Sequence, residues 1–197
     1  MTPFKAKNRV TSAYGYREYY NSGKLIKEYH KGLDIVPTAF AGEKVAADAW
    51  QVREVTGGKV VRVSSDQWRG KYVDVQTAPN TFERYQHMAS ICVTVGQSVP
   101  QGTVLGVAGA TGNVTGAHLH FGVYINGSAE GNAVAPQLWC GIPNIAGTYP
   151  GNDVLDNPPA AAAKKYKVTS GELTAGDKVS VEGYIRALGV DCTTVEV

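Results

Sequence analysis

Short segments in which apolar and polar residues alternate recur through residues 1–147. Segment 71–76, Lys-Tyr-Val-Asp-Val-Gln, alternates strictly, and such a period of two is typical of a half-buried β-strand. Further strands are predicted at 58–63, 82–88, 104–108 and 118–125. Segment 77–80, Thr-Ala-Pro-Asn, has the composition of a hairpin loop between two of these strands. Long amphipathic helical patterns are absent from this part of the sequence, so we predict a mainly β fold built on an antiparallel sheet.

The pattern changes at about residue 148. Segment 148–165 is dense in Pro, Gly, Asn and Ala and has no apolar face, which predicts a linker. In segment 166–197 an apolar stripe from Val181 to Leu188 predicts a helix between two strands. A βαβ unit of this size cannot bury a core of its own. We therefore predict a domain at 1–147, a linker, and a small module that packs on that domain, on a second copy of itself or on a ligand.

Composition limits the function classes. The 23 glycines favour a turn-rich β protein, and the net charge of +2 is too small to indicate nucleic-acid binding. Positive charges gather in residues 1–34, where they either approach an anionic polymer or are simply solvated. Cys92, Cys140 and Cys192 lack the spacing of a metal knuckle and are interpreted as reduced packing residues. No apolar stretch follows the start, so we expect neither a secretory signal nor a membrane span.

The four histidines fall into two short motifs and one isolated position. His30 and Asp34 form a His-x-x-x-Asp unit, His118 and His120 form a His-x-His unit, and His87 lies between them in the sequence. On a strand, the His-x-His imidazoles share one face while the intervening side chains face the core. One imidazole can then bind a metal ion while the other stands beside the metal-bound water. Each motif alone is weak evidence, because surface histidines and turn aspartates are common.

Taken together, the motifs indicate a single zinc-hydrolase site. Two neutral nitrogens and one carboxylate oxygen, with a fourth position left for water, form a catalytic zinc set. Zinc lowers the pKa of that water toward about 7 and polarises a substrate carbonyl. The two remaining histidines can accept a proton, stabilise an oxyanion or protonate a leaving amine.

The same motifs resemble the lysostaphin-like zinc endopeptidases, which cut peptide bonds in bacterial peptidoglycan. The resemblance covers most of residues 8–126 and is carried by segments 12–17, 30–35, 85–88, 96–99 and 109–121. It implies that His30, Asp34 and His120 ligate one zinc ion per chain and that His87 and His118 are the catalytic pair. Members of this family often use a tyrosine near the site, and the sequence does not select among the candidates Tyr14, Tyr16, Tyr19, Tyr20 and Tyr29.

The expected function is hydrolysis of peptide bonds in peptidoglycan stem peptides or cross-bridges, which would lyse the cell wall. The missing signal and the small tail suggest a phage or prophage endolysin, made in the host cytoplasm without a signal peptide and acting on the wall. Module 166–197 would then bind the wall or form a homodimer, and neither nucleic acid nor membrane is expected as a partner. Two alternatives lack catalysis: a wall-binding scaffold or activator of another hydrolase, and a plain binding domain. Zinc stoichiometry would separate them from the enzyme.

Overall fold

The computed structural model describes residues 1–21, 23–38 and 48–151, so the predicted βαβ module at 166–197 and most of the predicted linker lie outside the described residues. The strands are β1 Lys7–Ser12, β2 Gly15–Asn21, β3 Lys24–His30, β4 Leu33–Thr38, β5 Gln51–Arg53, β6 Gly58–Asp66, β7 Gly70–Ala78, β8 Thr81–Ile91, β9 Ser98–Val99, β10 Val104–Ala108, β11 Leu119–Ile125, β12 Ala133–Val134 and β13 Gly147–Tyr149. The helical elements are a 3-10 turn, Glu130–Asn132, and the short helix α1, Gln137–Cys140.

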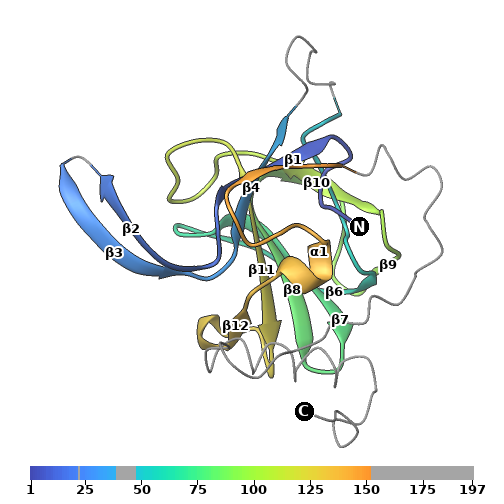
Figure 1. Cartoon of the computed structure of the whole chain (residues 1–197). Coiled ribbons are helices and arrows are strands. Elements are labelled where there is room, and N and C mark those ends of the chain that lie inside the picture. The colour runs from blue at the N-terminus through green and yellow to red at the C-terminus, as the bar shows by residue number, and fades with distance from the viewer. Residues whose placement is uncertain (22, 39–47, 152–197) are drawn as a thin grey trace, which may run out of the picture.

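One large antiparallel sheet forms the body of the molecule (Figure 1). Its strands follow the order β13-β1-β4-β11-β8-β7-β6-β9, with β10 and β5 continuing from β8 and β12 pairing with β11. The prediction of a mainly β, antiparallel fold is confirmed, and all five predicted strands are present as β6, β7, β8, β10 and β11. The predicted hairpin loop is the turn between β7 and β8, where Asn80 takes the left-handed conformation with φ 61°.

The core lies on one face of this sheet, where the apolar members of the alternating segments meet. Leu119 and Phe121 of β11 are fully buried, as the alternation predicted, and Leu33 and Ile35 of β4 pack beside them. Tyr85 of β8 contacts the Phe121 ring, with centroids 5.1 Å apart. The alternate positions on β4 and β11, which include Asp34 and His120, therefore point to the other face of the sheet.

The strict alternation of β7 is misleading at one position. A half-buried strand would expose Asp74, yet its side chain is only 1% exposed. Arg84 on β8 pairs with it through two hydrogen bonds, Nε to Oδ1 at 2.6 Å and an Nη to Oδ2 at 2.9 Å. The Arg84 guanidinium also lies 4.5 Å from the centroid of the Tyr124 ring. This polar cluster covers the second face of the sheet, so β7 is buried on both faces in its middle.

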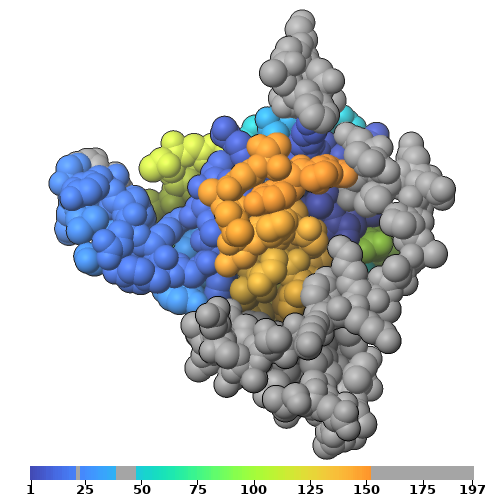
Figure 2. All heavy atoms as spheres, in the orientation of Figure 1, coloured from blue at the N-terminus to red at the C-terminus, as the bar shows by residue number. Residues whose placement is uncertain are grey.

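Strands β2 and β3 form a separate hairpin that projects from the body (Figure 2). It was not individually predicted, because neither of its faces is buried along its length and no hydrophobic alternation marks it. Four of its charged side chains are paired within the hairpin, Arg17 with Glu28 and Lys27 with Glu18. These two cations of the basic amino-terminal region are therefore not free to meet an anionic polymer as isolated charges.

The carboxyl-terminal edge of the described chain remains part of the sheet. Thr148 and Tyr149 lie in β13, which pairs with β1, so ordered structure continues past residue 147. Cys140 is buried in the core as predicted, whereas Cys92 is exposed and is not a core-packing residue. Cys192 lies outside the described residues. Within the described ranges, no helix has the length and apolar character needed to span a membrane.

A pair of carboxyl groups is buried in the core, one directly after β5 and the other on β8. Glu54 and Glu83 are both fully buried, and Glu54 Oε2 has no hydrogen-bond partner among the described residues. Tyr85 donates its hydroxyl to Glu83 Oε2 at 2.7 Å. Burial and the neighbouring charge of Glu54 raise the pKa of Glu83 well above its ordinary value. Folding therefore favours the protonated form of Glu83.

The substitution Glu54→Gln is expected to flatten the dependence of stability on pH. Because folding raises the pKa of Glu83, the free energy of unfolding is greatest below the ordinary carboxyl pKa of about 4.3 and falls as the pH rises through the folded-state value. Removing the Glu54 charge lowers the folded-state pKa of Glu83, so the variant should exceed the wild type in stability more at pH 8 than at pH 5. Urea unfolding at both pH values measures this, with the exposed Glu18→Gln as control. Equal differences at both pH values would contradict the expectation.

Candidate metal centre

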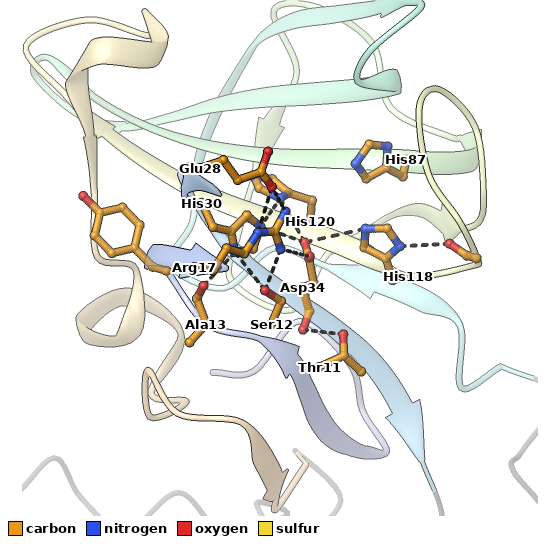
Figure 3. A network of polar contacts seen from close by, with 12 residues as sticks. Thr11, Ser12, Ala13, Arg17, Glu28, His30, Asp34, His87, His118 and His120 are labelled. Atoms are coloured by element: carbon orange, nitrogen blue, oxygen red, sulfur yellow. Dashed lines mark hydrogen bonds and ion pairs between the residues drawn. The ribbon is translucent and has the colours of Figure 1, made fainter. Parts of the chain in front are cut away.

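His30, Asp34 and His120 converge on one point at the surface of the sheet (Figure 3). His30 Nε2 lies 3.1 Å from Asp34 Oδ1 and 3.1 Å from His120 Nδ1, and His120 Nδ1 lies 3.0 Å from Asp34 Oδ1. Asp34 on β4 and His120 on β11 are directly opposite in the strand register, which explains how distant sequence motifs meet. The bend at Lys31–Gly32, between β3 and β4, returns His30 to the same point. The three residues predicted as metal ligands are thus brought together.

The orientation of the His30 ring is fixed by a hydrogen bond from the ring nitrogen that points away from the metal cluster. Its Nδ1 lies 2.7 Å from the Ala13 carbonyl oxygen, and because a carbonyl only accepts, Nδ1 carries the proton and donates it. The Nε2 lone pair is then directed at Asp34 and His120. Metal-binding imidazoles are commonly oriented by such a hydrogen bond from the other ring nitrogen. Ser12 Oγ, 3.4 Å from His30 Nδ1, lies beside the same nitrogen.

The electrostatics favour a neutral imidazole beside an ionised carboxylate. Burial lowers the pKa of His120, which favours the unprotonated ring that a metal ion requires. Burial alone would raise the pKa of Asp34, but its contacts with His120 and His30 outweigh burial and hold that pKa well below the usual range. The side chains are 5%, 14% and 12% exposed for His30, Asp34 and His120, so the cluster is shielded but reachable from solvent.

The donor set fits a tetrahedral zinc ion. Zinc bonds of about 2.0–2.2 Å to nitrogen and oxygen place ligand atoms about 3.3–3.5 Å apart. The observed separations of 3.0–3.1 Å require a movement of only a few tenths of an ångström. Three protein ligands leave one position open, which is the arrangement of catalytic rather than structural zinc sites.

His87 reaches the same site through an irregularity in β8. Tyr85 and Met88 are both fully buried, so the alternation of the strand breaks between them. His87 takes the left-handed conformation with φ 65°, unusual outside glycine, at the point where β8 changes partner from β11 to β10. Strict alternation would have placed its side chain in the core beside Tyr85. The bulge instead turns it to the face of His120, with ring centroids 6.0 Å apart.

His87 and His118 form a second layer beside the metal cluster. Their ring centroids are 4.8 Å apart, and His118 Nε2 lies 3.6 Å from Asp34 Oδ1. Each ring donates Nδ1–H to a carbonyl, His87 to Thr111 and His118 to Gly116, both at 2.9 Å. Both Nε2 atoms are therefore free to exchange protons. Burial is the main cause that lowers the pKa of His87 to about 4, so this ring is neutral near pH 7.

These side chains line an open cleft of about 860 Å³. One wall is the β2–β3 hairpin with Arg17, Tyr19 and Tyr29, and the other carries Trp68 and Arg69. Trp68 is 63% exposed, a large aromatic surface without cover beside the site. The sequence offers tyrosines of the hairpin as candidates for the site, but it assigns no role to Trp68 or Arg69, because nothing in their local patterns relates them to the histidines.

The five candidate tyrosines differ in their surroundings. Tyr14 donates its hydroxyl to the Ala133 carbonyl at 3.0 Å, and Tyr16 donates to Glu18 at 2.7 Å. Tyr19 and Tyr29 line the cleft, whereas Tyr20 is 75% exposed on the projecting hairpin. The cleft position favours Tyr19 and Tyr29 as the tyrosines nearest to a bound substrate, and a role for either in catalysis stays a prediction.

Gly32 has no space for a side chain. A Cβ atom there would lie 2.5 Å from both His120 Nε2 and the Phe121 carbonyl oxygen. The substitution Gly32→Ala is therefore expected to displace the His120 ring and weaken Zn²⁺ affinity by about 10- to 100-fold, the range seen when support around a ligand is lost. Gly131→Ala, where a Cβ meets nothing within 4 Å, is the matched control. Competition with a chromophoric chelator measures both, and equal affinities would show that the ring accommodates the methyl group.

An antiparallel sheet that presents two histidines and an aspartate to one point, beside two further histidines, defines a protein with a candidate catalytic metal centre. Comparison with known proteins identifies the family. Peptidase family M23 matches residues 28–136, which include all the predicted site residues and more than half of the chain. The chain belongs to peptidase family M23.

Individual relatives agree with this assignment. Peptidoglycan DD-endopeptidase ShyC of Vibrio cholerae is 32% identical over 119 residues, which are 60% of this chain and 25% of that protein. A zinc-containing peptidase from Vibrio cholerae has a similar structure, with a TM-score of 0.52 and 27% identity over 68% of this chain and 38% of the other. The catalytic domain of the prophage-encoded M23 protein EnpA from Enterococcus faecalis matches with a TM-score of 0.51 and 25% identity, covering 66% of this chain and 89% of that domain. The chain spans about a quarter of the length of the curated relatives it matches.

Proposed function

We propose that the protein is a zinc-dependent endopeptidase that hydrolyses peptide bonds in the stem peptides or cross-bridges of bacterial peptidoglycan and so lyses the cell wall. The convergence of His30, Asp34 and His120 beside His87 and His118 in one cleft carries this proposal. Membership of family M23 supports peptidase chemistry. The Vibrio cholerae relatives, named as peptidoglycan DD-endopeptidases, support peptidoglycan as the substrate.

The metal-binding group and the second histidine pair have different tasks in the proposed reaction. His30, Asp34 and His120 would hold one zinc ion per chain, and such an ion supplies Lewis-acid polarisation of a carbonyl and a water of lowered pKa. His87 is neutral near pH 7, so its Nε2 can accept a proton from the attacking water. His118 Nε2 lies 3.6 Å from Asp34 Oδ1, and from there it can stabilise the oxyanion or transfer a proton to the leaving amine. The Thr111 and Gly116 carbonyls keep both rings in the tautomer this requires.

We further propose that the protein acts as a phage or prophage endolysin, made in the host cytoplasm and acting on the cell wall. The similarity to a prophage-encoded M23 protein supports this origin. Module 166–197 is proposed to bind the wall or to form a homodimer. A comparison of wall pelleting and molecular mass between the full chain and a chain ending at residue 151 tests that role.

The alternative of a non-catalytic scaffold predicts a defective metal site. The convergence of His30, Asp34 and His120 and the nearby pair His87 and His118 both support the catalytic proposal, and no observation on the described residues favours the scaffold. A full-length protein that holds less than one zinc ion per chain after careful repletion would support the scaffold instead.

The proposed function is tested by product analysis on purified peptidoglycan. Walls with direct cross-links and walls with glycine-containing bridges are digested with and without a chelator, and the released muropeptides are identified by mass spectrometry. A new amino terminus that appears only when zinc is present is expected, and it names the bond that is cut. Intact muropeptides from every wall type, despite bound zinc, would contradict the proposal.

A further inference from the structure

Arg17 extends from the β2–β3 hairpin into the metal cluster. Gly15 pairs with His30 in the hairpin, so Arg17, two residues further along β2, lies on the same face as His30. Its NH1 group is 2.6 Å from Ser12 Oγ and 3.4 Å from Asp34 Oδ2. Figure 3 shows Arg17 among Glu28, Ser12 and Asp34. No part of the chemistry proposed above uses this residue.

The two oxygens of Asp34 have different neighbours. Oδ1 faces His30 and His120 at 3.1 and 3.0 Å and is the ligand atom of the cluster. Oδ2 faces the Arg17 guanidinium. A carboxylate that rotates freely binds a metal ion through one oxygen or through both, and two-oxygen binding would occupy the position that water needs.

We propose that Arg17 is a positioning residue that holds Asp34 as a one-oxygen ligand and thereby keeps the remaining coordination position open. The inference rests on the proposed function in one respect, the identity of the three metal ligands. The side chains are 29% exposed for Arg17 and 14% for Asp34, so solvent screens their attraction only partly. An ordered ion pair in this setting controls direction more than it adds stability.

The same guanidinium also supports His30. Arg17 donates to Ser12 Oγ, and Ser12 Oγ lies 3.4 Å from His30 Nδ1, which itself donates to the neighbouring Ala13 carbonyl. The strand register of β1 shifts between Val10 and Ser12, and this irregularity sets Ser12 opposite Asp34. Arg17 therefore contacts both Ser12, which lies beside His30, and the Oδ2 atom of Asp34.

The hairpin fixes Arg17 in turn. Glu28, on the paired strand, accepts hydrogen bonds from Arg17 Nε at 2.8 Å and from a terminal nitrogen of the guanidinium. The guanidinium carbon lies 5.2 Å from the centroid of the Tyr19 ring. Three acceptors in different directions require the planar fork of arginine, which a lysine ammonium does not reproduce.

Metal affinity and coordination geometry test this role without reference to substrate. Arg17→Met is expected to weaken Zn²⁺ affinity by about 10- to 100-fold in chelator competition. In the Co²⁺-substituted protein the visible absorption should also become weaker, as coordination by both Asp34 oxygens raises the coordination number. Arg17→Lys, which keeps the charge, is expected to recover part of the affinity. Lys27→Met, which breaks the exposed Lys27–Glu18 pair of the same hairpin, should change neither readout.

Wild-type Zn²⁺ affinity together with a wild-type Co²⁺ spectrum in Arg17→Met would overturn the inference. If Arg17→Met does not fold, Ser12→Ala takes its place: it removes the acceptor that aligns the guanidinium, and the same two wild-type readouts in it would overturn the inference. The proposed function fails separately, when the wild-type protein binds zinc and shows the expected effects of Arg17 but cleaves no peptidoglycan.

Discussion

Replacing His120 with alanine is expected to abolish tight zinc binding and endopeptidase activity together. His120 Nδ1 lies 3.0 Å from Asp34 Oδ1 and 3.1 Å from His30 Nε2, so its loss leaves two ligands where a zinc ion requires three from the protein. The neighbouring strand β8 is not expected to replace the lost ligand, because Gln86, which lies opposite His120, offers only an amide. Metal analysis after gel filtration and muropeptide release measure the two losses in one preparation.

His118→Ala is the matched control, since it removes the other imidazole of the same motif. His118 Nε2 is 3.6 Å from Asp34 Oδ1, but the three ligand atoms that lie within 4.8 Å of one another belong to His30, Asp34 and His120. We therefore expect His118 to transfer protons and not to hold the metal ion. The variant should keep one zinc ion per chain and lose activity by about 10²- to 10⁴-fold, the usual contribution of a positioned acid or base. An active, chelator-resistant His120→Ala protein, or a His118→Ala protein without zinc, would contradict this division of roles.

The sequence predicts those parts of the structure that depend on local alternation. The strand that carries His120 places Leu119 and Phe121 in the core, and the opposite face then has to carry both histidines of the motif. His30 and Asp34 lie on either side of the short turn between β3 and β4. Local pattern is sufficient here because each residue lies on a regular strand or directly beside a turn.

Alternation fails where the backbone is irregular or a charge is buried. His87 reaches the cleft only because the backbone irregularity at its φ of 65° changes which face of the sheet the following side chains of β8 point to. No period in the sequence indicates such a bulge. Asp74 looks like a solvent-facing residue until Arg84, ten positions away on the next strand, is seen to cover it. Arg17 belongs to a recognisable segment, but its contact with Asp34 depends on how the hairpin folds back. In all three cases the position of the side chain depends on contacts between strands, which local sequence patterns do not show.

The buried Arg84–Asp74 pair links fold stability to the wall of the cleft. Arg84 also donates to Glu130 Oε1 at 2.9 Å, and the same oxygen accepts from Arg69 at 3.0 Å. Arg69 in turn lines the cleft, and its carbonyl oxygen accepts the backbone N–H of His87 at 2.9 Å. One network thus extends from the interior of the sheet to the strained residue of the site.

Arg84→Met is therefore expected to lower the free energy of unfolding by about 3–5 kcal/mol, because it leaves the Asp74 carboxylate buried without its partner. Arg62 provides the control: it contacts the same carboxylate at 3.7 Å, but its own side chain is 49% exposed, so Arg62→Met should change stability by at most about 1 kcal/mol. Urea unfolding of both variants and of Arg84→Met combined with Asp74→Asn gives the comparison. The double substitution should recover part of the loss, since it removes the stranded charge. If Arg62→Met and Arg84→Met were equally mild, the pair would not be buried as the structure places it, and the wall of the cleft would owe its position to other contacts.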